Sequence, residues 1–210
     1  MSATLARSAE SDSPKRQSIL DAAAELFIAQ GYEAVSMDAI ARAAGVSKAT
    51  LYAHFGSKDQ LFGTIIREAC QTNLAAREFL TDEPDMRTAL TRLGSRMLRF
   101  LLEDRSLAIH RVVMSESLRF PELGRAFYES GPQTFDRCFG DWLRAATDAG
   151  RLRVSHPIRA ADQFVGMLKC GVWTRAALGV PPPPDDAEID ATVAAAVETF
   201  LRAYGDRPPG

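Results

Sequence analysis

Hydrophobic residues recur every three or four positions through most of the 210-residue chain, which is the spacing of amphipathic helices. Proline and glycine separate these stretches, and the alternation typical of strands is almost absent. The first helix is expected to begin at Pro14, after a capping Ser13, and to stop at Gly31. Its apolar face consists of Ile19, Ala23, Leu26 and Phe27.

Residues 36–58 show the pattern of two short helices joined by a tight turn. Ala41 is small, Gly45 follows four residues later, and Leu51 follows six residues after that. This spacing suits closely crossing helices, because Gly45 can adopt a positive φ without a steric penalty. The pattern predicts a helix-turn-helix whose recognition helix spans about residues 47–55. The alternative is a tight helix pair of an ordinary all-α protein.

Polar side chains on the recognition helix indicate a nucleic-acid surface. Leu51 and Phe55 lie four residues apart and form the stripe expected to be buried. Groups that can donate hydrogen bonds to phosphates and base edges are found in Lys48, Thr50, Tyr52, His54 and Lys58. For Lys58, the alternative is a solvated lysine in the first turn of the next helix.

The stretch that begins at Gly45 fits the pattern G-[VI]-S-K-x-x-L-Y-x-[HY]-F-x-[SN]-K-x-x-L. It resembles the TetR/AcrR family of bacterial transcriptional regulators, and the resemblance covers about residues 15–62. The resemblance implies operator contacts at the positions of Ser36, Lys48, Ala49, Thr50, Tyr52, His54 and Lys58. Ser47, which opens the recognition helix, is expected to join this DNA-contacting set. Ala53 stands where many members carry His or Tyr, so a phosphate contact possible there in other members is absent here.

The C-terminal part also resembles this family. The stretches LRFLLEDRSLAIHRVVMSESLRFPELGRAFYESGP and AGRLRV are similar to AefR-like C-terminal domains. Domains of this kind bind varied small molecules and form dimers, so the resemblance implies an effector and a homodimer. The fold class expected is therefore all-α, with a three-helix helix-turn-helix domain followed by a larger helical domain for ligand binding and dimerisation.

The domain organisation follows from the same pattern. We expect a disordered tail over 1–13, a DNA-binding domain over 14–60, a regulatory and dimerisation domain over 61–204, and a loose tail over 205–210. Proline and glycine divide the larger domain into predicted helices over about 86–103, 106–117, 121–130, 133–149, 157–178 and 185–204.

The last two predicted helices carry more apolar surface than a monomer easily hides. The pattern predicts a dimer seam made of Phe164, Leu168, Val172, Val193 and Phe200. The alternative is that both helices pack only within their own chain. We favour the dimer, because two recognition helices one turn of duplex apart (~34 Å) read a pseudo-palindromic operator far better than one module does.

The central helices carry apolar, aromatic and flexible side chains that suit a small hydrophobic effector. The predicted ligand-binding set is Met97, Phe100, Leu101, His110, Met114, Phe135, Phe139 and Trp142. The alternative for each of these residues is an ordinary place in the core.

Composition and charge modify this interpretation only locally. The net charge of −2 argues against nucleic acid for the whole chain, but residues 36–58 carry a local charge of +2. The first 13 residues lack the apolar core of an export signal, and no apolar run reaches the ~18 residues of a membrane span. We therefore expect a cytoplasmic protein that does not enter the membrane.

The sequence contains no motif of a common enzyme class. P-loop, GxGxxG, HExxH, GxSxG and CxxC patterns are all missing, and the three cysteines are widely spaced. We therefore predict no catalytic residue, no metal site and no cofactor. The main prediction is a homodimeric repressor released from its operator by a small hydrophobic ligand. The alternatives are an all-α enzyme with a site assembled from scattered residues, and a DNA-binding regulator without a small-molecule ligand.

Overall fold

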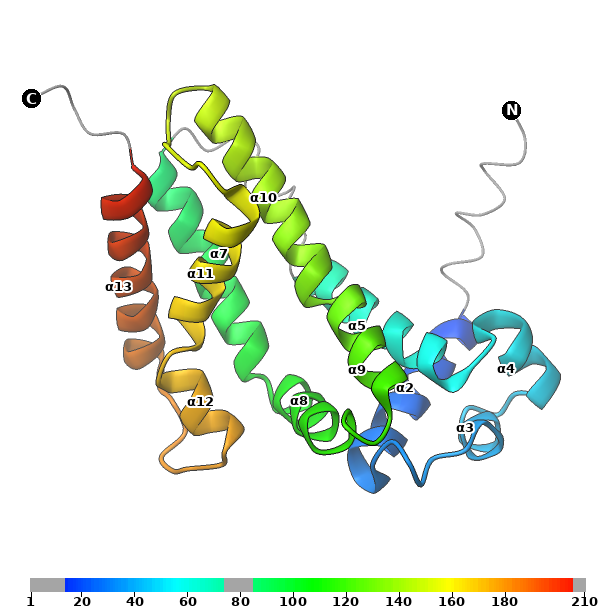
Figure 1. The fold of residues 1–210 in the computed structure, drawn as a ribbon. Coiled ribbons are helices and arrows are strands. Elements are labelled where there is room, and N and C mark those ends of the chain that lie inside the picture. The colour runs from blue at the N-terminus through cyan, green and yellow to red at the C-terminus, as the bar shows by residue number, and fades with distance from the viewer. Residues whose placement is uncertain (1–13, 74–84, 206–210) are drawn as a thin grey trace, which may run out of the picture. The chain divides into compact units, whose positions relative to one another are not determined.

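The computed structural model describes residues 14–73 and 85–205, and it confirms the all-α fold (Figure 1). The described helices are α2 (Pro14–Gln30), α3 (Met37–Ala43), α4 (Lys48–Phe55), α5 (Lys58–Asn73), α7 (Met86–Leu102), α8 (Asp104–Glu116), α9 (Pro121–Ser130), α10 (Pro132–Asp148), α11 (Pro157–Lys169), α12 (Val172–Ala177) and α13 (Asp186–Tyr204). The predicted tail over 1–13 lies outside the described residues, as does the predicted tail over 205–210 except for Gly205. None of the helices in the described ranges combines the length and apolar character needed to cross a membrane.

The chain folds as two compact units, and their boundary differs from the predicted one after residue 60. The N-terminal unit contains residues up to 68 together with 108–130, and the C-terminal unit contains 69–107 and 131 onward. Close packing of α5 on α9 explains why the later segment joins the first unit. A Cβ at Gly63 would lie only 3.0 Å from the Oγ of Ser130. Both α5 and α8 begin in one unit and end in the other.

An aromatic cluster forms the centre of the N-terminal unit. Phe27, Tyr32 and Phe62 are each at most 2% exposed, and their ring centroids lie 5.5–5.9 Å apart. The ring of Phe120, just before α9, packs 5.7 Å from that of Tyr32 in an edge-to-face arrangement. Such pairs add to the hydrophobic gain from burial, so α2, α5 and the α8–α9 connection share one core.

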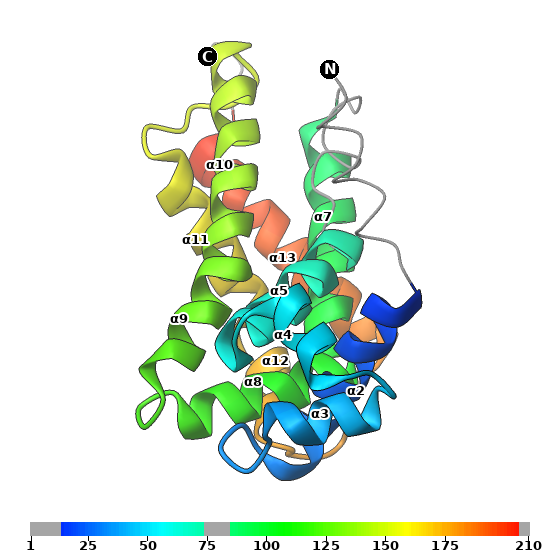
Figure 2. The same cartoon turned by 90° about the vertical axis from the view of Figure 1, so that its right-hand side faces the viewer.

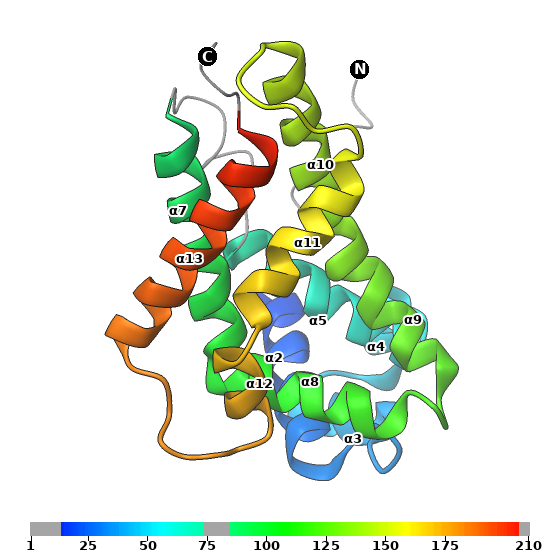
Figure 3. The ribbon, with the colours of Figure 1, turned by 60° about the vertical axis from the view of Figure 1, so that its left-hand side comes forward.

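The C-terminal unit is built around α13, which packs against α7 and α11 (Figure 3). Phe139, Phe164 and Phe200 come from α10, α11 and α13, are fully buried, and lie with ring centroids 5.4–6.4 Å apart. Gly94 lets α7 approach this cluster, because a Cβ there would lie 3.1 Å from Cγ1 of Val193. One continuous apolar core therefore holds these four helices together.

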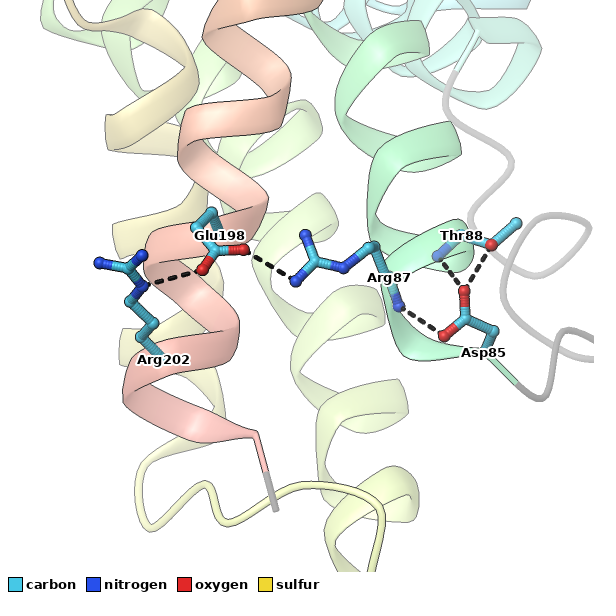
Figure 4. A network of polar contacts seen from close by, with 5 residues as sticks. All are labelled: Asp85, Arg87, Thr88, Glu198 and Arg202. Atoms are coloured by element: carbon cyan, nitrogen blue, oxygen red, sulfur yellow. Dashed lines mark hydrogen bonds and ion pairs between the residues drawn. The ribbon is translucent and has the colours of Figure 1, made fainter. Parts of the chain in front are cut away.

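A polar network fixes α7 beside α13 at the surface of this unit (Figure 4). The Asp85 carboxylate caps α7 by accepting a hydrogen bond from the backbone N–H of Thr88 at 3.0 Å. The Arg87 guanidinium donates to Glu198 on α13 at 2.8 Å, and Arg202 donates to the same carboxylate at 2.8 Å. These two guanidinium groups hold the pKa of Glu198 below its ordinary value. Because the groups are exposed, the network sets the register of the helices more than it stabilises them.

One predicted helix is divided in two. The pattern predicts a single helix over 157–178, whereas the structure has α11 and α12 with a break at Cys170 and Gly171. Cys170 is extended with ψ 127°, and Gly171 takes a φ of +71°, which favours glycine. Two consecutive residues outside the helical region interrupt the hydrogen-bond ladder, although the apolar spacing continues across them.

The five residues predicted for the dimer seam are buried inside a single chain, which corrects that prediction. None of them is more than 6% exposed, and four belong to the continuous core of the C-terminal unit. A side chain that is buried in its own core offers no surface to a second chain. These five residues are Phe164, Leu168, Val172, Val193 and Phe200.

Candidate nucleic-acid interface

The end of α3 and the turn into α4 are set by backbone hydrogen bonds around Gly45. The N–H of Val46 donates to the carbonyl of Ala41 at 3.0 Å, and the N–H of Gly45 donates to Arg42 at 3.3 Å. This pair of bonds is a Schellman motif, which requires a left-handed residue after the helix. Gly45 supplies it with a φ of +66°. The angle between α3 and α4 thus depends on a residue without a Cβ.

Two serines cap the helices of the pair. The Oγ of Ser36 accepts a hydrogen bond from the N–H of Ala39 at 3.1 Å, at the start of α3. The Oγ of Ser47 accepts from the N–H of Thr50 at 3.0 Å, at the start of α4. It also lies 2.7 Å from the Oγ1 of Thr50, with either hydroxyl as the donor. Since only one hydrogen is used in that contact, the other hydroxyl keeps a hydrogen for an external acceptor.

The helix α4 lies beside α3 (Figure 2), and its exposed side carries polar residues that are predicted to contact DNA. Leu51 and Phe55 are buried, at 0% and 5% exposed, and attach the helix to its unit. The exposed residues of the predicted DNA-contacting set on this helix are Lys48, Ala49, Tyr52 and His54. Thr50 is half-buried beside Ser47, so the helix has an apolar side and a polar side as its sequence predicts.

Lys48 has an acidic partner that the sequence analysis missed. Its Nζ lies 2.8 Å from Oδ1 of Asp38 on α3, and 5.9 Å from the centre of the Tyr52 ring. The hydrogen bond to Asp38 raises the pKa of Lys48, so this side chain stays positively charged. Both members of the pair are more than half exposed. A phosphate at this position would therefore compete with Asp38 for the Lys48 ammonium.

Lys58 points into its own unit, unlike the other cation of the predicted set. Its Nζ donates hydrogen bonds to the carbonyls of Tyr32 at 2.7 Å and Val35 at 3.0 Å, and lies 4.2 Å from the centre of the Tyr32 ring. Burial lowers the pKa of Lys58, against the raising effect of nearby carboxylates, Glu116 first among them. An ammonium has three donors, so at most one is left for the phosphate contact. The alternative, in which the Lys58 ammonium is surrounded by water, is not observed either, because two backbone carbonyls bind it.

A second carboxylate missed by the sequence analysis is Glu116, at the end of α8. Its two oxygens accept hydrogen bonds from the backbone N–H groups of Tyr32 and Glu33, each at 2.8 Å. These residues are more than 80 positions apart in the chain, and no local pattern connects them. Only the folded structure shows that α8 contacts the segment leading into α3.

The residues predicted to bind a ligand are divided between the two units. Met97, Leu101, Phe135 and Phe139 are at most 7% exposed and belong to the C-terminal core, and Phe100 and Trp142 pack against that core. The other two lie on α8 within the N-terminal unit. There, the ring of His110 lies 4.9 Å from that of Phe127, and Met114 is 75% exposed.

Comparison with known proteins places this architecture in a family. Residues 19–65 match the family model of the bacterial regulatory proteins of the tetR family. Residues 88–206, more than half of the chain, match the model of the C-terminal domain of AefR-like transcriptional repressors. The chain belongs to the TetR family. The resemblance noted from the sequence is thus confirmed for both parts of the protein.

Individual TetR-family proteins are similar over most of their length. The transcriptional repressor AcnR of Corynebacterium efficiens is 28% identical over 78% of this chain and 82% of its own. A solved TetR-family regulator from Mesorhizobium loti is 32% identical, with a TM-score of 0.78 over 91% of this chain and 96% of that chain. The flavonoid-responsive regulator FrrA is 35% identical, with a TM-score of 0.73 over 92% of this chain and 98% of its own.

Family membership decides between the classes of function considered above. TetR-family proteins are transcriptional regulators that bind operator DNA and act as dimers, and they are not enzymes. The alternative of an all-α enzyme is therefore set aside. The protein is a transcriptional regulator of the TetR family.

Proposed function

We propose that this protein is a homodimeric repressor that binds a pseudo-palindromic operator and is released by a small hydrophobic ligand. The observation that carries the proposal is the outer face of α4, where donor side chains stand exposed on a helix fixed by Ser47 at one end and by Leu51 and Phe55 beneath. A helix of this kind fits the major groove of DNA. In a dimer, two copies would occupy successive turns of the duplex.

The chemistry of each side chain suggests its part in this interface. Lys48 is a point charge suited to phosphate, whereas the Thr50 hydroxyl is suited to a base edge. The exposed methyl group of Ala49 fits the methyl group of thymine, and Tyr52 and His54 can donate to phosphate or to bases. Ser36, which caps α3, would place the start of that helix near the DNA backbone.

Charge changes at Lys48 and Asp38 should have opposite effects on DNA affinity. Lys48→Ala should weaken binding to all sequences and reduce the salt slope by about one unit, because one phosphate contact is lost. Asp38→Asn should strengthen binding to all sequences, since the carboxylate no longer competes for Lys48. Filter binding across a salt series measures both effects on an operator located by genome-wide footprinting.

Two further variants make this test specific. Arg151→Ala removes one exposed positive charge from the C-terminal unit, outside α11 and α13, and should leave both affinity and salt slope unchanged. Thr50→Ala should alter the preference among operators while keeping the salt slope. Equal effects of Lys48→Ala and Arg151→Ala would refute the phosphate contact, because a change in net charge would then explain both results.

For the dimer seam, we propose the exposed faces of α11 and α13 in place of their buried residues. Most of the exposed face of α13 is small: Ala187, Ala191, Ala194, Ala195 and Ala203 are all exposed. Side chains of this size lose little entropy on burial and let helices from two chains approach closely.

For the effector, we propose an aromatic molecule of the flavonoid class that enters the C-terminal unit beside Phe100 and Trp142. FrrA, which is 35% identical over almost the whole chain, is named as flavonoid-responsive. Phe100 and Trp142 are only partly buried, and the ring of Trp142 stacks on Phe139 with centroids 5.8 Å apart. A planar aromatic ligand is suited to pack against such rings.

A flavonoid panel should raise the melting temperature of the protein and release it from its operator. A ligand that binds only the native state stabilises it by about 2.7 kcal/mol at one hundred times its Kd. Trp142→Phe and Phe100→Leu should still bind the operator but need more flavonoid for release, as measured by operator release against ligand concentration. Unaltered release curves would show that both residues are ordinary core residues without a role in ligand binding. No thermal shift with any compound would favour a regulator without a small-molecule ligand.

A further inference from the structure

The carboxylate of Glu116 binds the backbone that leads into α3. It accepts hydrogen bonds from two successive N–H groups, those of Tyr32 and Glu33, at 2.8 Å each. Hydrogen bonds to an ionised acceptor are roughly twice as strong as neutral ones. The contact depends on Gly31, because a Cβ there would lie 2.6 Å from Oε1 of Glu116. Glu116 is therefore built into this turn rather than resting on its surface.

Lys58 binds the same segment through its carbonyl groups. Its ammonium donates to Tyr32 and Val35 at 2.7 and 3.0 Å, and Val35 directly precedes Ser36, the N-cap of α3. The amides of residues 32–33 are thus bound by a carboxylate, and the carbonyls of Tyr32 and Val35 by an ammonium. Backbone groups bound by opposite charges in this way have little freedom to rotate.

Two more contacts bring the α8–α9 connection to this segment. The guanidinium of Arg119 pairs with the Glu33 carboxylate, and the Phe120 ring packs against the Tyr32 ring. These contacts flank the backbone hydrogen bonds made by Glu116. The start of α3 is therefore held mainly by residues far from it in sequence.

We propose that Glu116 is a positioning residue for operator binding. Together with Lys58 it fixes residues 32–35, and so the start of α3, against α8 and α5. This inference rests on the proposed use of α3 and α4 to bind the operator.

The structure offers a matched control for a test of Glu116. Glu122, at the start of α9, also acts by its charge on both Lys58 and Tyr32. In the described part of the chain, the Glu122 carboxylate makes no hydrogen bond. Glu116→Gln and Glu122→Gln therefore remove the same charge from the same neighbourhood, but only the first disturbs the bonds to the Tyr32 and Glu33 amides.

The experiment combines hydrogen exchange with DNA binding. In the wild-type protein, the Tyr32 and Glu33 amides should be protected from exchange. Glu116→Gln should speed their exchange and weaken operator binding about tenfold, within the usual range of coupling between sites. Its binding to unrelated DNA should weaken less than its operator binding, because the phosphate contact proposed for Lys48 on α4 remains. Glu122→Gln should leave exchange and both affinities as in the wild type.

Each outcome has a definite meaning. Unprotected amides in the wild-type protein would overturn the proposal without any variant. Equal operator affinities for Glu116→Gln and Glu122→Gln would also overturn it, since charge or a purely structural role would then explain the result. If the wild-type protein showed no operator preference, the proposed function would be wrong. Protection of the Tyr32 and Glu33 amides would still test whether Glu116 binds them.

Discussion

Replacing Leu168 with Glu is expected to unfold the C-terminal unit rather than to produce a folded monomer. Leu168 is fully buried, and a Cβ added at Gly94 on the facing helix α7 would lie 3.4 Å from its Cδ2. A carboxylate in this position has no water and no partner, at a cost of several kcal/mol. Because a domain is stable by only about 5–15 kcal/mol, much of the folded population should be lost. Thermal melting followed by circular dichroism measures this loss.

The matched variant is Gly166→Glu on the same helix. Gly166 is exposed, and a Cβ there would meet nothing within 4 Å, so the C-terminal unit should remain folded. If α11 contributes its exposed face to the dimer, sedimentation should show a folded monomer with weakened operator binding. The opposite pattern, a folded monomer for Leu168→Glu and an intact dimer for Gly166→Glu, would restore the seam predicted from the sequence.

The incorrect prediction of the dimer seam shows what can and cannot be inferred from hydrophobic periodicity. The spacing of Phe164, Leu168 and Val193 indicates correctly that these positions are buried. The spacing does not show which surface buries these residues. Burial inside the same chain and burial against a second chain require the same residue types. Leu168 is buried by α7 of the same chain, which lies about 70 positions earlier in the sequence.

The helix-turn-helix was predictable because its determinants are local. Ser36 and Ser47 act as caps through N–H groups three residues away, and Leu51 and Phe55 share a face because they lie four residues apart. Gly45 meets a steric requirement of the turn itself. Each of these signals lies within one or two helical turns of the structure that it specifies.

The partners of the charged residues were not predictable in the same way. Lys58 is predicted to contact DNA because it can donate to phosphate and because the resemblance implies an operator contact at its position. Its ammonium instead binds carbonyls 23 and 26 positions earlier. The sequence around Glu116 indicates only an ordinary carboxylate near the end of a helix. The direction of a long side chain depends on which backbone groups the fold leaves without partners, and that is a property of tertiary structure.

Phe62→Ala should abolish operator binding while leaving the C-terminal unit folded. Phe62 is fully buried against Phe27 and Tyr32, and removal of such a ring costs about 3–5 kcal/mol. The loss falls on the core that holds α2, α5 and the helix-turn-helix, whereas the C-terminal core contains none of these residues. Denaturant unfolding should therefore show an early transition that is absent in the wild type.

The control for this change is Tyr128→Ala, which removes an aromatic ring from the same unit. Tyr128 is 54% exposed, so its loss should shift stability by about 0.5 kcal/mol at most and keep operator binding. A single shared transition for Phe62→Ala, in which both units unfold together, would contradict the expectation, because it would show that the two cores form one cooperative structure. Separate transitions would mean that the DNA-binding unit can lose its order while the C-terminal unit keeps its own.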